Sequence, residues 1–502
     1  MGTALTPNGR YLAVTNDGQG VQSVMVFDTR SEKVVDTVKY PAPKALFVGL
    51  AFSRDGKRLY ASAGGNDKIR VYDHSKGSIV ERSPIKLDNT SNGSYFPAGL
   101  AVSPSGDRLF VANNLDDSVA VIDLASETVD TFVNVGSHPY MVAFDDHKGK
   151  AYVSNWGTDT LSVLDAASTT VTGTITVGSR PNDIVASPTR PEMYVANENV
   201  DTVSVVDTRT DKVTGTVNLA PYPNAPHGSL PDALAVSQNG KTLYVANAGN
   251  NDIAVVDLGH GHTTTDHTVT GLIPTAWFPS ALSLAPNGKT LYVANMKGLG
   301  AGPNPNGPNP TKGGYNDNGI KGVKSQYIGN MINGTVSTIA VPDDAKLAQY
   351  TKQVVQNNGF DERTNTQTRP ASQVNPQPVP HRVGDPSPIE HVIYVIKENR
   401  TYDQVFGSLN KGNGDASLTL FGEKSAPNQR ELAREFTLFD NFYTDAEVSA
   451  GGHNWSTAAI ANTYVQKTWP ADYSGRNRPY DFESANTPAN PGDYIWNKAA
   501  AK

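Results

Sequence analysis

The sequence predicts an all-β propeller of seven blades followed by an incomplete α/β domain. Two repeated patterns within residues 3–341 predict the propeller, and an α/β-like composition from Ile389 onward predicts the second domain. Repeats of roughly 40–50 residues with four short strands each are typical of propeller blades. We therefore expect the propeller over residues 1–341, a polar, proline-rich linker over 342–388 and the α/β domain over 389–502.

The first repeated pattern is L-[YF]-V-A-N, which follows a turn. Its aromatic residue is expected to fill space between blades, and its asparagine to cap the next turn with its side chain. Close copies occupy 109–113, 193–197, 243–247 and 291–295, and weaker copies occupy 11–16, 59–64 and 151–155.

The second repeated pattern is an alternating strand that ends in aspartate. Six copies end at Asp28, Asp73, Asp123, Asp165, Asp207 and Asp257, and a seventh ends at Ala340. We expect the aspartates to accept hydrogen bonds from their turns rather than to bind metal. Seven copies predict seven blades. The repeats resemble the YVTN family of β-propellers, a resemblance that implies the fold and says almost nothing about function.

The last blade departs from the pattern in two ways. It offers three strands and then a helix-like stretch, 344–356, so we expect an exposed strand edge. The missing outer strand is expected to belong to residues upstream of Met1. A Gly-, Pro- and Asn-rich insertion, 301–330, interrupts this blade. A long irregular loop is often functional, and we expect it to pack against the second domain.

Composition excludes several classes of protein. The net charge of −7 is spread along the chain, so no nucleic-acid partner is expected. The sequence has no cysteine, which excludes disulfides and thiolate metal sites. No apolar run reaches the roughly 18 residues of a membrane span. His260, His262 and His267 lie near Asp266, but such loops are exposed and a solvated role is favoured over metal binding.

Two apolar stretches in the second domain are expected to be neighbouring buried strands. The first, 391–396, runs directly into Lys397, Glu398 and Asn399. The second, 436–443, is followed by an acidic loop that ends at Ser449, and a helix-like run follows over 454–465. Ligands of open α/β sheets collect beyond the carboxyl ends of the strands, so Glu398, Asn399 and Ser449 are expected on one rim.

The residue types on this rim suit metal-assisted hydrolysis. A carboxylate and an amide oxygen, from Glu398 and Asn399, can hold a hard cation. A serine at a helix N-terminus lies where backbone N–H groups and the helix dipole favour a phosphate. Together these parts are what ester hydrolysis with a serine nucleophile requires.

The motifs ENRTYDQVFG, at 398–407, and FTLFDNFY, at 436–443, resemble the phosphoesterase family of the alkaline phosphatase superfamily. That family includes phospholipase C and some acid phosphatases. The resemblance implies that Glu398 and Asn399 lie at the metal site and that Ser449 is the nucleophile, with His453 four residues later. Related enzymes often carry Pro-Asn where this chain has Gly451-Gly452, so Ser456 and Thr457 remain alternatives for the nucleophile.

The resemblance therefore implies a phosphoesterase that acts on a phosphoester substrate. Ser449 and His453 would be catalytic, and Glu398, Asn399 and Ser449 would hold a divalent ion such as Zn²⁺, Mg²⁺, Mn²⁺ or Ca²⁺. Further family ligands come from the later half of the domain, and no Asp-His or His-x-His cluster follows Ser449. We therefore expect a truncated domain that binds metal weakly and has little activity by itself. The family also implies an exported bacterial protein, periplasmic or extracellular, whose leader is missing here.

Two other interpretations remain open. The propeller could be a non-catalytic module that binds a ligand or a protein at its face. Alternatively, the propeller itself could be the enzyme, as in seven-bladed lactonases. That interpretation needs acids and histidines that converge at the funnel mouth, and none stands out in the repeats.

Overall fold

The structure is a computed structural model. It describes residues 1–41, 44–87, 94–145, 149–259, 267–301, 328–360, 375–380, 385–482, 488–489 and 494–500. The chain divides into two compact units. The first contains Met1–Gly302, Ile328–Asn358 and Asp445–Lys502, and the second contains Pro303–Tyr327 and Gly359–Thr444. Residues 445–502, which the sequence assigns to the second domain, thus group with the propeller.

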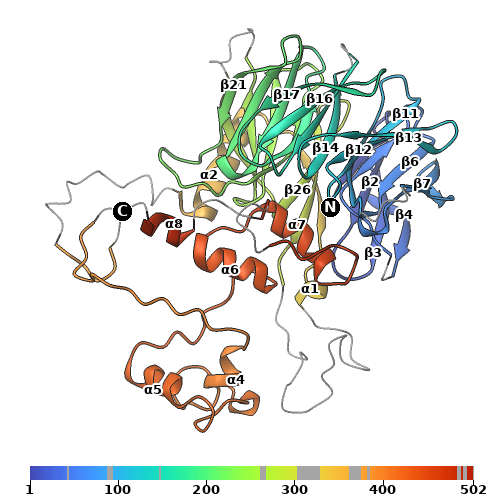
Figure 1. The fold of residues 1–502 in the computed structure, drawn as a ribbon. Coiled ribbons are helices and arrows are strands. Elements are labelled where there is room, and N and C mark those ends of the chain that lie inside the picture. The colour runs from blue at the N-terminus through green and yellow to red at the C-terminus, as the bar shows by residue number, and fades with distance from the viewer. Residues whose placement is uncertain are drawn as a thin grey trace. The chain divides into compact units, whose positions relative to one another are not determined.

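Seven antiparallel sheets form the blades of the propeller, as predicted (Figure 1). Blades one to three consist of β1 (Thr3–Leu5), β2 (Tyr11–Asn16), β3 (Gln22–Asp28), β4 (Lys33–Tyr40); β5 (Leu50–Phe52), β6 (Arg58–Ser62), β7 (Lys68–Ser75), β8 (Ser78–Glu81), β9 (Ile85–Lys86); and β10 (Pro97–Val102), β11 (Arg108–Asn113), β12 (Ser118–Asp123), β13 (Thr128–Asn134). Blades four and five consist of β14 (Pro139–Asp145), β15 (Lys150–Asn155), β16 (Thr160–Asp165), β17 (Thr170–Thr176); and β18 (Pro181–Ala186), β19 (Glu192–Asn197), β20 (Thr202–Asp207), β21 (Lys212–Asn218). Blades six and seven consist of β22 (Pro231–Val236), β23 (Thr242–Asn247), β24 (Asp252–Asp257), β25 (Thr268–Pro274); and β26 (Trp277–Leu284), β27 (Thr290–Gly298), β28 (Thr335–Ala340).

The first strand of each blade lies innermost, and these strands contact one another in a closed ring. β10 contacts β14, β14 contacts β18, and so on to β26, which contacts β1. A hydrogen bond between the hydroxyls of Thr3 and Ser283, 2.9 Å long, joins the first and last blades. The inner strands therefore surround a central channel.

The repeat residues have the structural roles that the sequence predicts. Phe110 of blade three packs against Phe144 of blade four, with ring centres 5.1 Å apart, so the pattern aromatic fills space between blades. The repeat asparagines bridge their hairpins: Asn155 donates to the hydroxyl of Thr160 at 3.1 Å. The strand-end aspartates cap their turns, as Asp165 does by accepting the backbone N–H groups of 167 and 168.

Among the residues that the structure describes, blade seven has three strands, which confirms the prediction that it lacks an outer strand in this chain. Helix α2 (Asp344–Asn358) follows β28 and packs against β25 of blade six, with Leu347 beside Gly271. The inserted loop, 302–327, and the histidines at 260 and 262 with Asp266 lie outside the described residues.

The two strands expected in the second unit are wrong. Residues 391–396 and 436–443 form no strand, and Ile393 and Phe442 are 92% and 83% exposed. A buried strand needs hydrogen-bonded neighbours and an apolar cover, and the described part of this unit supplies neither a sheet nor a cover. An apolar run predicts that a segment favours burial, but it does not predict that partners are present.

The helices of the chain follow the sequence more closely. They are α1 (Ile328–Met331), α4 (Tyr402–Phe406), α5 (Pro427–Glu435), α6 (Ser449–Ala458), α7 (Thr463–Asp472) and α8 (Ile495–Ala500). The helix expected over 454–465 is instead two helices, because the backbone at Ala459 is left-handed, with φ of 58°, and ends α6. No helix in the described part of the chain is long and apolar enough to cross a membrane.

Blade six carries a buried carboxyl where neighbouring blades carry a hydroxyl. Asn247 donates to Asp252 at 2.8 Å, whereas the equivalent asparagines donate to Thr160 and Thr202. Burial raises the pKa of Asp252 to about 7, and its Oδ2 has no hydrogen-bond partner among the described residues. The folded protein therefore favours the protonated acid up to a pH of about 7.

We expect Asp252→Thr to stabilise the propeller at alkaline pH. Because the folded pKa exceeds the unfolded one, Asp252 costs stability as the pH rises from about 4 to about 7. The substitution should raise the free energy of unfolding by roughly 1–3 kcal/mol near pH 8 and change it little near pH 4. Urea denaturation at both pH values measures this. Thr202→Asp, the reverse change in blade five, should lower stability near pH 8, and a destabilised Asp252→Thr variant there would contradict the expectation.

Candidate functional site

The predicted nucleophile lies at the start of a helix. Ser449 is the first residue of α6, and Val448 before it is extended, with φ of −139°. The backbone N–H of Ala450 donates to the hydroxyl of Tyr473 at 3.3 Å. His453 follows one turn later on α6, and its side chain is exposed. The expected helix-start position of Ser449 is therefore confirmed.

The alternative hydroxyls are bonded within the helix. Ser456 donates to the backbone carbonyl of His453 at 3.1 Å, and Thr457 donates to the same oxygen at 2.5 Å. These bonds direct both hydroxyl protons toward the helix backbone. Ser449 is thus the candidate that lies at the N-terminal end of the dipole.

Glu398 and Asn399 belong to the second unit and lie in an exposed segment without regular secondary structure. Their oxygen donors are of the type that divalent cations prefer. However, three side-chain donors, with Ser449, are fewer than the roughly six contacts that such a cation needs. No group of three or more His, Asp or Glu side chains in the described residues is placed to hold a metal. The predicted site, with one carboxylate, one amide and one hydroxyl, has a different composition from such groups and stays a prediction.

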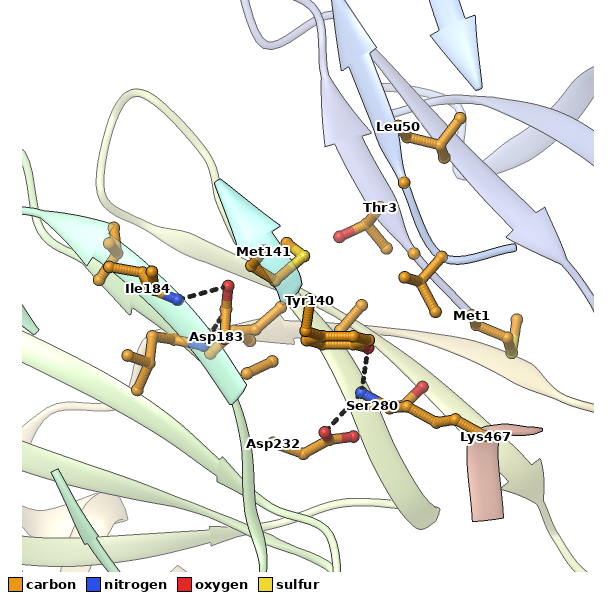
Figure 2. A pocket seen from close by; sticks show the side chains of 18 of the residues that line it. Met1, Thr3, Leu50, Tyr140, Met141, Asp183, Ile184, Asp232, Ser280 and Lys467 are labelled. Carbon is orange, nitrogen blue, oxygen red and sulfur yellow. Dashed lines mark hydrogen bonds and ion pairs between the residues drawn. The ribbon is translucent and has the colours of Figure 1, made fainter. Parts of the chain in front are cut away.

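The structure contains a buried polar cluster at the propeller channel that the sequence did not reveal. Lys467 projects from α7 between Asp232 and Tyr140 (Figure 2). Its ammonium lies 2.5 Å from Asp232 Oδ1 and 2.7 Å from the Tyr140 hydroxyl. The two charged side chains are 2% and 0% exposed. Burial lowers the pKa of Lys467, but the nearby carboxylate of Asp232 outweighs it and keeps the amine charged.

A second carboxylate holds the beginning of α7. Glu198 accepts hydrogen bonds from both the backbone N–H and the hydroxyl of Thr463. A carboxylate at a helix N-terminus is favoured by the helix dipole. Burial raises the pKa of Glu198 to about 7. Asn182 links the two acids, because its amide donates to Asp232 at 2.5 Å and to the Thr463 hydroxyl at 3.1 Å.

Residues 445–482, here named the axial segment, contact every blade of the propeller. These contacts hold both ends of the segment, with Glu447 bound to Lys297 and Arg476 bound to Gly18. In order of blades, they join Arg476 to the carbonyls of Gly18, Gln19 and Gly20; Asn477 to Gly65; Arg478 to Asn114; Lys467 to Tyr140; Thr463 to Asn182 and Glu198; Lys467 to Asp232; and Glu447 to Lys297.

Beneath α7 lies a cavity of about 200 Å³, lined by inner strands and by Lys467. Asp183 lines it and accepts the backbone N–H groups of Ile184 and Leu234, at 2.9 and 2.8 Å. Burial raises the pKa of Asp183 to about 6. The cavity thus has both an acid that titrates near neutrality and a fixed ammonium.

The acids do converge at the channel, contrary to the sequence-based expectation. The signal was present at the residue after the inner-strand proline that blades three to seven share. That position reads Ala98, Tyr140, Asn182, Asp232 and Ser280. A buried inner strand favours apolar residues there, so the side chains with a polar group in four successive blades, four to seven, mark the cluster.

Residues 47–131 and 131–299, together about half of the chain, match the family described as lactonase, 7-bladed beta-propeller. The chain belongs to this lactonase-type propeller family. Hydrazine synthase from Kuenenia stuttgartiensis is a similar solved structure, with 22% identity and a TM-score of 0.50 over 59% of this chain and 92% of that one. At that identity the likeness shows the fold alone. No curated protein matches the chain.

The lactonase family match covers blades two to six and the first two strands of blade seven, and it ends before the axial segment. The family therefore accounts for the inner strands that carry Tyr140, Asp183 and Asp232. It does not account for α6 and α7. The helix that covers the channel, α7, therefore lies outside the part of the chain that matches the family.

We expect Lys467→Met to destabilise the first unit strongly, because Asp232 loses its ion-pair partner and burial, which already raises the pKa of this carboxyl, then opposes its ionised form. Loss of one partner of a buried pair costs about 3–5 kcal/mol. The double variant Lys467→Met/Asp232→Asn should recover much of that loss, since the buried charge is removed.

Thermal and urea denaturation measure both variants. Lys150→Met is a matched control, because Lys150 pairs with Asp211 at 2.6 Å in a half-exposed site. Such a pair contributes about 0–1 kcal/mol. An effect of Lys467→Met no larger than that of the control would show that the channel pair does not hold α7.

Proposed function

We propose that this protein is a phosphoesterase in which Ser449 is the nucleophile. The observation that carries the proposal is the position of the Ser449 hydroxyl on the first residue of α6. There, backbone N–H groups and the helix dipole favour the negative charge of a phosphoester. The Glu398-Asn399 motif and the serine four residues before His453 support it through the family resemblance.

The reaction is a transfer to serine followed by hydrolysis. The Ser449 oxygen forms a bond to phosphorus, the bond from phosphorus to the leaving oxygen breaks, and the alcohol departs with a proton. Water then attacks the phosphoserine and releases phosphate, which restores the serine. N–H groups at the start of α6 stabilise the charge that develops on the phosphoryl oxygens.

His453 would assist on the same face of the helix, since residues four apart are neighbours. It would bind the substrate or a metal. Glu398 and Asn399 would supply oxygen ligands to a divalent cation, and in such enzymes a cation lowers the pKa of the attacking hydroxyl, here that of Ser449. Because the described donors are too few for that cation, no step is assigned to it.

The propeller would serve as the support of the reacting segment. The alternative, a propeller that binds an external ligand at its channel mouth, has less support because Lys467 of α7 already occupies that mouth. A ligand at this face would have to displace a buried ion pair.

We expect Ser449→Ala in the full-length protein to lower turnover of p-nitrophenyl phosphate about 10³-fold or more. Ser456→Ala is the matched control on the same helix, because its hydroxyl is directed to the backbone carbonyl of His453, and it should retain turnover within about threefold. Loss of turnover in the Ser456 variant with retention in the Ser449 variant would reverse the assignment.

We also expect turnover to need a metal. Dialysis against EDTA should abolish it, and one of Zn²⁺, Mg²⁺, Mn²⁺ or Ca²⁺ should restore it. Glu398→Gln should raise the metal concentration for half-maximal turnover about tenfold or more, because a charged oxygen ligand is lost. Turnover that is unaffected by EDTA would contradict this part of the proposal.

A further inference from the structure

Two ion pairs, both largely shielded from solvent, join the axial segment to the propeller. In one pair the lysine belongs to the axial segment, and in the other it belongs to the propeller. In the channel, Lys467 of the axial segment inserts toward Asp232 of β22. In the second pair, here named the rim pair, the lysine comes from the propeller. Lys297 of β27 pairs with Glu447 of the axial segment at 2.8 Å. The rim pair is the one that adjoins the proposed nucleophile, because Glu447 precedes Ser449 by two residues.

The rim pair is well fixed. Lys297 and Glu447 are 16% and 8% exposed, so solvent and salt screen their attraction only weakly. The Lys297 ammonium also lies 5.5 Å from the centre of the Phe278 ring. Phe278 is itself buried, and its backbone N–H donates to Asn251 at 2.8 Å. Lys297 therefore has a second contact, with Phe278 of blade seven, in addition to its ion pair with Glu447.

The residue after Ser449 is held as well. The N–H of Ala450 donates to the hydroxyl of Tyr473, which follows α7. The backbone carbonyl of Tyr473 accepts a hydrogen bond from the side chain of Gln19 at 3.4 Å. Nearby, Arg476 donates to three successive carbonyls, those of residues 18–20 of blade one. The chain on both sides of Ser449 is thus tied to the propeller, by blade seven before it and by blade one after it.

We propose that Lys297 is a positioning residue for Ser449, so that the propeller is an integral part of the hydrolytic site rather than a separate recognition module. This inference rests on the proposed function. Lys297 acts through Glu447, whose tether fixes the direction in which the chain enters α6. A displacement of about 1 Å at a reacting atom can cost 10²-fold in rate.

The charge of the pair adds a second effect. Without Lys297, the carboxylate of Glu447 would stay almost buried and unpaired two residues from the nucleophile. A negative charge there opposes an anionic phosphoester. The Lys297→Met variant should therefore lose more activity than Lys297→Met/Glu447→Gln, in which both charges are removed.

The test uses steady-state kinetics of the full-length protein with p-nitrophenyl phosphate. Lys297→Met should lower kcat by about 10- to 100-fold with KM changed less than about threefold, because geometry is altered more than substrate binding. Lys297→Arg, which keeps the charge, should recover kcat to within about fivefold of wild type, and the double variant with Glu447→Gln should recover part of it. Lys150→Met, the control pair elsewhere on the propeller, should leave kcat unchanged.

Hydrogen exchange of the α6 amides gives a readout that does not depend on activity. Lys297→Met should speed exchange at residues 449–452, while Lys150→Met should not. A Lys297→Met variant with wild-type kcat and wild-type exchange would overturn the inference. If wild-type protein hydrolyses no phosphoester, the proposed function fails, and exchange alone then decides whether Lys297 holds the start of α6.

Discussion

The packing of the first unit depends on the burial of Lys467 among the inner strands. A buried ammonium is tolerated only where a carboxylate and hydrogen-bond acceptors replace its water. Asp232 and Tyr140 provide that replacement from the inner strands of blades six and four. Because the lysine comes from α7, separation of this helix from the inner strands would leave Asp232 without its ion-pair partner. The remaining contacts of the axial segment, one or more with each blade, follow from that placement.

The axial segment also bears on how the ring is closed. Blade seven has three strands in this structure, so the first and last blades share no strand. They are joined instead by contacts between β1 and β26 and by the axial segment, which binds Gly18–Gly20 in blade one through Arg476 and Lys297 in blade seven through Glu447. These side-chain contacts add to the contact between β1 and β26. The segment with the proposed nucleophile therefore also supports the fold.

Local patterns in the sequence predicted what depends on local physics. The repeat fixed the blades, because residues such as Tyr152 and Asn155 have the same surroundings in each copy. The helix start at Ser449 came from the family resemblance, since the helical pattern itself predicted a helix only from 454 onward. The strand predicted at 391–396 was wrong, because β-branched residues such as Ile393 form a strand only when neighbours pair with them. The channel cluster was missed because Asp232 and Lys467 meet only through the closed ring and the helix that covers it.

The covered channel has a consequence for the divergence of such proteins. A substitution at Asp232 would leave Lys467 of α7 without its ion-pair partner. We therefore expect these two positions not to change independently. We expect the two positions to covary among propellers that share this axial segment, and to vary freely in propellers that have no axial helix. The presence of the pair would then indicate when, in the evolution of these propellers, the axial helix was acquired.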